Sequence, residues 1–105
     1  MAKFYCESGL FKTIVDAPNG DIAAQKAIRR LLQEEIPHTC FLTLGERGFN
    51  YPKGIMYSII PLLRAEGIPL LPDDELAESI CKFLSIPNLS EKDRHWLLYG
   101  GASEQ

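Results

Sequence analysis

Residues 4–35 read FYCESGLFKTIVDAPNGDIAAQKAIRRLLQEE, and their pattern predicts the first elements of the fold. It contains most of two segments rich in aromatic and β-branched residues, Lys3–Glu7 and Leu10–Asp16, which flank Ser8-Gly9. Two such segments joined by a short link that contains glycine predict a β-hairpin, because glycine reaches positive φ without strain. Alternation of side chains gives this hairpin one apolar face.

A helix is predicted after the turn Pro18-Asn19-Gly20-Asp21. Asn19 is the expected N-cap, and the helix is expected to run to about Glu35, because Pro37 stops it at Ile36. The apolar residues of this segment recur at helical spacing: Ala24, Ala27, Ile28, Leu31 and Leu32. That spacing predicts one buried stripe, which packs on the apolar face of the hairpin.

The rest of the chain adds a second pair of strands and three further helices. The expected elements are, in order, a strand at 38–44, a loop at 45–54, a strand at 55–57, and helices at 59–66, from Asp73 and after Ser90. We therefore predict an α+β fold: a ββαββα-like antiparallel sheet with one helix packed on it, followed by a helical C-terminal third. The 105 residues are expected to form a single domain, with the sheet-plus-helix core at 1–67 and a helical extension at 68–105.

Composition limits the classes of function. A net charge of −3 and a pI of about 5.3 argue against a general binder of nucleic acid or anionic membranes, which needs an excess of cations. No apolar run approaches the roughly 20 residues of a membrane span, and the first residues contain no signal-peptide core. The cysteines at positions 6, 40 and 81 are far apart and odd in number, which favours reduced thiols. We therefore expect a cytoplasmic protein that does not engage a membrane.

Catalytic and metal-binding patterns are weak in this sequence. No glycine-rich phosphate loop, Ser-His-Asp set or pair of inward carboxylates can be placed. His38 and Cys40 are two positions apart, so on the expected strand they share a face, as a thiol–imidazole pair or two metal ligands would. Cys40 falls on the face assigned to the core, however, where a free cysteine packs as a small hydrophobic residue. We therefore predict no catalytic residue, no metal ligand and no cofactor.

The loop at 45–54 is one candidate for contact with a partner. It gathers two cations and two aromatic rings that carry this prediction: Arg47, Phe49, Tyr51 and Lys53. Such a loop is suited to contact a protein surface or a base. Its start, Gly45–Gly48, matches the GxxG pattern of KH domains, but it follows a strand here, and a turn with two glycines is the favoured interpretation.

Two helical segments are further candidates. Trp96 and Tyr99 give the last helix a large apolar load, so this helix either returns onto the domain or docks against a second copy. Lys26, Arg29 and Arg30 form a cationic patch on the first helix. A solvated face is the default interpretation of that patch, and nucleic-acid contact is the alternative.

The hairpin followed by an alanine-rich helix, entered through Pro18-Asn19-Gly20-Asp21, resembles the β-β-α opening of HicB-type antitoxin domains. This resemblance implies a regulatory binding module and not an enzyme. From the residues themselves we predict a small cytoplasmic interaction or regulatory module without catalysis, which binds a protein partner or associates with itself. Two alternatives stay open: a nucleic-acid-associated regulatory protein, and a small enzyme with an unrecognised site.

Overall fold

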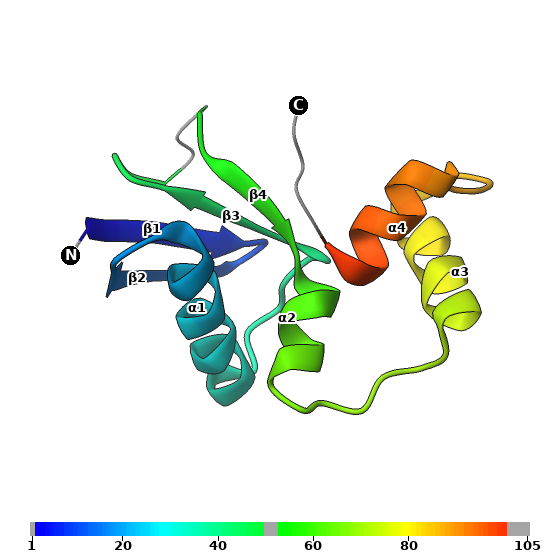
Figure 1. Cartoon of the computed structure of the whole chain (residues 1–105), viewed down its shortest axis with the longest axis horizontal. Coiled ribbons are helices and arrows are strands. Elements are labelled where there is room, and N and C mark those ends of the chain that lie inside the picture. The colour runs from blue at the N-terminus through cyan, green and yellow to red at the C-terminus, as the bar shows by residue number, and fades with distance from the viewer. Residues whose placement is uncertain (1, 50–52, 101–105) are drawn as a thin grey trace.

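The computed structural model describes residues 2–49 and 53–100. Within these residues the chain forms four strands and four helices (Figure 1). In chain order they are β1 Ala2–Ser8, β2 Phe11–Ala17, α1 Gly20–Glu34, β3 Phe41–Gly45, β4 Ile55–Ser58, α2 Ile59–Ala65, α3 Asp73–Leu84 and α4 Glu91–Tyr99. The fold is therefore of the α+β class that the sequence predicts.

The four strands form one antiparallel sheet in the order β2-β1-β3-β4. Helix α1 covers one face of this sheet, and α3 and α4 lie beside its β4 end (Figure 1). The opposite face, called the open face below, carries the side chains of Tyr5, Glu7 and Lys12, which alternate with the buried ones. This order makes β2 and β4 the two edge strands.

The β1–β2 hairpin turns at Gly9-Leu10, one residue later than the predicted link. Ser8 pairs with Phe11 and closes the turn. Gly9 has a φ of 60°, and a two-residue hairpin turn favours a positive φ at this position. A β-carbon at Gly9 would lie 3.1 Å from Cα of His38, so the turn needs glycine for close approach as well as for its dihedral angles.

Helix α1 begins as the sequence predicts. The side chain of Asn19 accepts a 3.0 Å hydrogen bond from the amide of Ile22, which caps the helix. The residues that α1 buries against the sheet are Ala23, Ala24, Ala27, Ile28 and Leu31. The prediction that Leu32 belongs to this stripe is wrong, because its side chain is 40% exposed. It lies about 100° around the helix from Leu31, outside the sector that meets the sheet.

The predicted strand at 38–44 is wrong at its beginning, because β3 starts only at Phe41. Thr39 instead bonds to the end of β1: its amide donates to Ser8 Oγ at 3.0 Å, and its Oγ1 lies 3.1 Å from the same oxygen. These side-chain bonds take the place of ladder bonds, so the residues before Phe41 form a connector. His38 and Cys40 therefore do not share a strand face.

The C-terminal helices form a second hydrophobic cluster beside the sheet. Its buried members are Ile60, Ile80, Leu97 and Leu98. Ser58 directly precedes α2, but its hydroxyl does not cap that helix and donates instead to the carbonyl oxygen of Leu97. Helix α4 contacts α2 and β4 of its own chain. Of the two arrangements open for the last helix, the structure has the one in which it returns onto the domain.

Candidate interaction surface

The edge of β2 is covered by two cations from α1. Arg30 donates from Nη1 to the carbonyl oxygen of Ile14 at 2.7 Å and to Thr13 Oγ1 at 2.8 Å. Lys26 donates from Nζ to the carbonyl oxygen of Asp16, also at 2.7 Å. The carbonyls of alternate residues point outward from an edge strand, and these are the groups that another strand would use. Strand addition at β2 would therefore displace both side chains.

The edge of β4 is arranged differently. The amide of Ile59, directly after β4, donates to the carbonyl oxygen of Cys40 at 3.1 Å, so the N–H of Ile59 points toward the β3 side. Bonded and non-bonded pairs alternate along an antiparallel ladder, which directs the N–H and C=O of Met56 away from β3. Within residues 2–49 and 53–100 neither group has a partner. We call this side of Ile55–Ser58 the β4 edge.

The first two side chains of the β4 edge are apolar and exposed, whereas Tyr57 is half-buried and Ser58 is buried. Ile55 and Met56 are each 51% exposed, and the strand contains neither a charged residue nor a proline. Natural edge strands commonly carry lysine, proline or a bulge that discourages pairing. The β4 edge lacks the first two of these protections.

A hollow of about 460 Å³, the edge hollow, runs along this strand. It is lined by Ile55–Ser58, by Asp21 of α1, by Pro61 and Leu62 of α2, and by Trp96, Tyr99 and Gly100 at the end of α4. Tyr57 donates to Asp21 Oδ1 at 2.9 Å. Burial and this hydrogen bond raise the pKa of Tyr57, so its hydroxyl remains a donor at neutral pH.

A second hollow of about 440 Å³, the face hollow, lies on the open face of the sheet. Its lining comes from three stretches of the chain: Glu7, Ser8, Gly9, Thr39, Phe41, Thr43 and Met56. Met56 lines both hollows, because its main chain lies at the β4 edge while its side chain projects from the open face. The two hollows therefore share Met56 as a lining residue, and we treat the surface around it as the candidate site.

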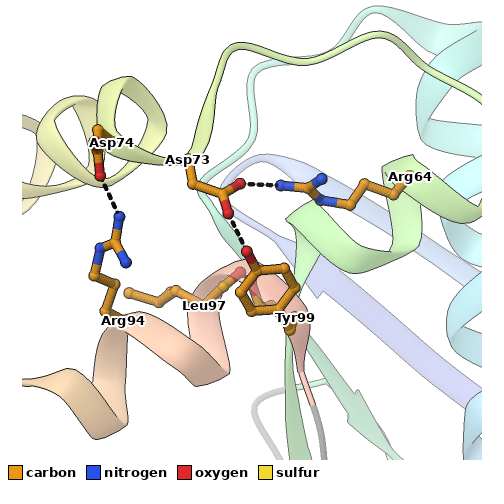
Figure 2. Close-up of polar contacts among 7 residues, drawn as sticks. Arg64, Asp73, Asp74, Arg94, Leu97 and Tyr99 are labelled. Carbon is orange, nitrogen blue, oxygen red and sulfur yellow. Dashed lines mark hydrogen bonds and ion pairs between the residues drawn. The ribbon is translucent and has the colours of Figure 1, made fainter.

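Polar contacts fix the rim of the edge hollow (Figure 2). Asp73 at the start of α3 accepts a 2.8 Å hydrogen bond from Arg64 of α2 and another from the hydroxyl of Tyr99. The Arg64 guanidinium carbon also lies 5.7 Å from the ring centre of Tyr99. Arg94 of α4 pairs with Asp74 beside this group. Together these contacts tie the end of α4 to α2 and α3, which positions the Tyr99 ring.

The same contacts shift two ionisation equilibria. Hydrogen bonds from Tyr99 and Arg64 hold the pKa of the Asp73 carboxyl below its usual range. The bond to Asp73 raises the pKa of the Tyr99 hydroxyl. Asp73 is therefore an anion, and Tyr99 a neutral donor, at every pH near neutrality.

Trp96 is held by an aromatic contact with the sheet. Its ring stacks on Phe41 of β3 with centroids 6.1 Å apart and an angle of 26° between the ring planes. Trp96 and Tyr99, which the sequence analysis predicts as partner contacts, both line the edge hollow. Because the chain contains one tryptophan, the fluorescence of Trp96 reports on this site alone.

The loop residues lie over a different part of the open face. Phe49 packs edge-on against Tyr5 with centroids 5.4 Å apart, and Lys12 Nζ lies 5.4 Å from the centre of the Phe49 ring. Arg47 and Lys53 are exposed. Tyr51, the fourth predicted contact of this loop, lies outside the described residues.

The cationic patch of α1 does not form one surface. Lys26 and Arg30 reach toward β2, whereas Arg29 pairs with Glu66 at 3.0 Å beside α2. Glu66 also accepts a 2.7 Å hydrogen bond from Gln25. Nucleic-acid contact through these three cations would compete with bonds they already make inside the chain.

His38 and Cys40 both lie in the connector before β3, and they differ in exposure. His38 is exposed and Cys40 is half-buried, and neither lines the edge hollow or the face hollow. Burial raises the pKa of the Cys40 thiol, which is opposite to the shift that activates a nucleophilic cysteine. Among the described residues, no group of three His, Cys, Asp or Glu side chains is placed to hold a metal ion.

Comparisons of the chain with protein-family models, with curated proteins and with solved structures find no match. The resemblance to HicB-type antitoxin domains therefore remains one of element order in the first hairpin and helix. Within the described ranges, no helix is long and apolar enough to cross a membrane. The features of the chain that bear on its function are thus the two edges of the sheet and the surface around Met56.

Proposed function

We propose that this chain is a non-catalytic interaction module that binds an extended polypeptide segment of a protein partner at the β4 edge. The segment adds to the sheet as a further strand, beside β4. The observation that carries this proposal is the difference between the two edges: Lys26 and Arg30 occupy the carbonyls of β2, whereas the main chain of Met56 is available.

Strand addition supplies two kinds of interaction at this site. The outward N–H and C=O of Met56 give main-chain hydrogen bonds, each contributing about 1 kcal/mol net. The exposed side chains of Ile55 and Met56 add apolar area on either side of the added strand. The edge hollow accepts side chains of the added strand against Trp96, which gives the site selectivity.

The free thiols of the chain agree with a cytoplasmic setting for this role. Cys6 is buried, and Cys40 and Cys81 are half-buried without a disulfide. Self-association at the same edge is one form of the proposed interaction.

A short synthetic strand tests the proposal. The probe is the peptide Lys-Gly-Ile-Met-Tyr-Ser, which copies residues 53–58, and its control carries an N-methyl group on the methionine amide. We expect saturable changes in Trp96 fluorescence and in the Met56 amide resonance with the probe, and weaker changes with the control. The proposal fails if neither signal responds while circular dichroism shows the fold intact.

A protein variant sharpens this test. Met56→Pro removes the outward amide without removing a ladder bond to β3, and proline is tolerated on edge strands for this reason. We expect the variant to fold and to lose most of the response to the probe. Unchanged binding by a folded Met56→Pro protein would place the peptide elsewhere.

A second candidate function is contact with single-stranded nucleic acid on the open face. The specific observation in its favour is the cluster of Tyr5, Phe49 and Lys12, which combines two rings with a cation. Bases stack on such rings, and the cation approaches the phosphates. This candidate predicts oligonucleotide binding that weakens steeply with added salt and is lost in Phe49→Ala. Retention that salt leaves unchanged would count against it.

A further inference from the structure

We infer that the strand bound at the β4 edge is β4 of a second copy of this chain, so that two four-stranded sheets join into one of eight strands about a two-fold axis at Met56. This inference rests on the proposed function, because it uses the same edge. It goes further by naming the partner and the register.

The sequence of the edge is complementary to itself. With Met56 opposite the partner's Met56, antiparallel pairing sets Ile55 opposite the partner's Tyr57 and Gly54 opposite the partner's Ser58. The two methionine side chains meet on the open face, and Ile55 meets the ring of the partner's Tyr57 on the α1 face. None of these residues is charged, so self-pairing opposes no like charges directly.

A folded second copy is a better occupant of this edge than a flexible peptide. The strand has only four residues, so few main-chain bonds are available to offset the ordering of a disordered segment. In a second copy, β4 is already ordered by its pairing with β3. Binding between preformed strands therefore loses less conformational entropy.

The covered edge of β2 limits the assembly to two copies. A sheet with two bare edges can extend indefinitely, whereas pairing through one edge about a two-fold axis closes. After dimer formation the outer strands are the two β2 strands, whose carbonyls at Ile14 and Asp16 are occupied by Arg30 and Lys26. The dimer is thus protected against further strand addition by the side chains of α1.

Sedimentation of the full chain between low and high micromolar concentration tests this inference. The protein has a mass of 11.8 kDa, and we expect a reversible transition to twice that mass. Each copy has a net charge of −3, so added salt should leave the association unchanged or strengthen it. The chain remaining monomeric over the whole range would overturn the inference.

Two matched variants locate the interface. Met56→Lys places two like charges side by side at the two-fold axis and should weaken dimer formation at least tenfold. Ile14→Lys puts the same charge on the other edge strand, at a residue that is 43% exposed, and should leave the dimer unchanged. Equal dimerisation of the Met56→Lys and wild-type proteins would overturn the inference.

Cross-linking provides a second readout that does not depend on affinity. Bonded antiparallel residues have Cα atoms about 5.5 Å apart, which lies within the range of a disulfide. In a background of Cys40→Ser and Cys81→Ser, Met56→Cys should form an interchain disulfide far faster than Ile14→Cys. Equal rates of cross-linking would contradict the register proposed here.

The two proposals fail in distinguishable ways. A monomeric chain whose Trp96 fluorescence still responds to the peptide of residues 53–58 would overturn the dimer and leave strand addition standing. A monomeric chain whose Trp96 fluorescence also shows no response to this peptide would overturn both proposals. A dimer that Met56→Lys disrupts and Ile14→Lys preserves is the result we expect.

Discussion

Arg30 donates a 2.7 Å hydrogen bond to the carbonyl oxygen of Ile14, so a helix side chain occupies an acceptor that a neighbouring strand would otherwise use. Lys26, one turn earlier in α1, donates a hydrogen bond to the carbonyl oxygen of Asp16 in the same way. The sheet therefore has one edge that its own helix protects and one that is available. This asymmetry connects the packing of α1 to the assembly we infer.

Removing both protecting cations should expose the edge of β2. We expect Lys26→Met with Arg30→Met to lower the free energy of unfolding by about 1 kcal/mol per hydrogen bond lost. We also expect the dimer to associate further into larger species at high concentration, because its outer edges become available. Static light scattering as a function of concentration measures this change.

The control for this double variant is Arg29→Met. It removes a positive charge from the same helix, but its side chain pairs with Glu66 beside α2 and not with β2. Its scattering should remain that of the wild type. Larger species formed by Arg29→Met as well would show that lost charge, and not the exposed edge, drives the association.

Gly9→Ala should destabilise the hairpin. The position has a positive φ, which costs an alanine roughly 1–2 kcal/mol, and the new β-carbon would also crowd the main chain of His38. Gly67→Ala provides the comparison, because Gly67 also has a positive φ but has no atom within 4 Å of the added carbon. Urea unfolding should show the larger loss for Gly9→Ala. Equal losses would mean that crowding against His38 adds nothing to the change in the free energy of unfolding.

The first hairpin and α1 were predictable because their signals are local. The Asn19 cap and the spacing of Ala24, Ala27 and Ile28 need only neighbouring residues, and the structure confirms them. The predicted start of β3 is wrong because a residue distant in sequence determines it. The hydroxyl of Ser8 accepts a hydrogen bond from the amide of Thr39, which a local sequence pattern cannot reveal.

The candidate site was less predictable because it depends on strand order. Which strands are edges follows from the order β2-β1-β3-β4, and no local pattern specifies that order. The roles of Lys26 and Arg30 cannot be recognised without it, so the sequence places them only on a solvated or nucleic-acid-binding face. One usable signal was the absence of charge and proline in Ile55–Ser58. Trp96 was marked for partner contact on composition alone, and it lies at the edge hollow.

Acid should weaken the attachment of α4 through Asp73. Because hydrogen bonds from Tyr99 and Arg64 lower the pKa of Asp73 in the folded state, its anion stabilises the fold above the ordinary aspartate pKa of about 3.9. That contribution is lost as the pH falls through the folded pKa. We expect the wild type to lose thermal stability below about pH 4 more steeply than Asp73→Asn.

Fluorescence of Trp96 separates this local effect from general acid unfolding. Loss of the Asp73 contacts should alter the emission of Trp96, which lies on the same helix as Tyr99, before far-ultraviolet circular dichroism changes. Parallel pH profiles for the wild type and Asp73→Asn by both methods would contradict the role assigned to Asp73.

Hydrogen exchange at the amide of Met56 distinguishes the monomer from the proposed dimer. In a monomer this amide faces solvent from the β4 edge, and in the dimer it donates to the partner's Met56. We predict that its protection rises with protein concentration, while the outward amide of Ile14 exchanges at one rate throughout. Exchange at Met56 that is as rapid as at Ile14 at every concentration would contradict the account.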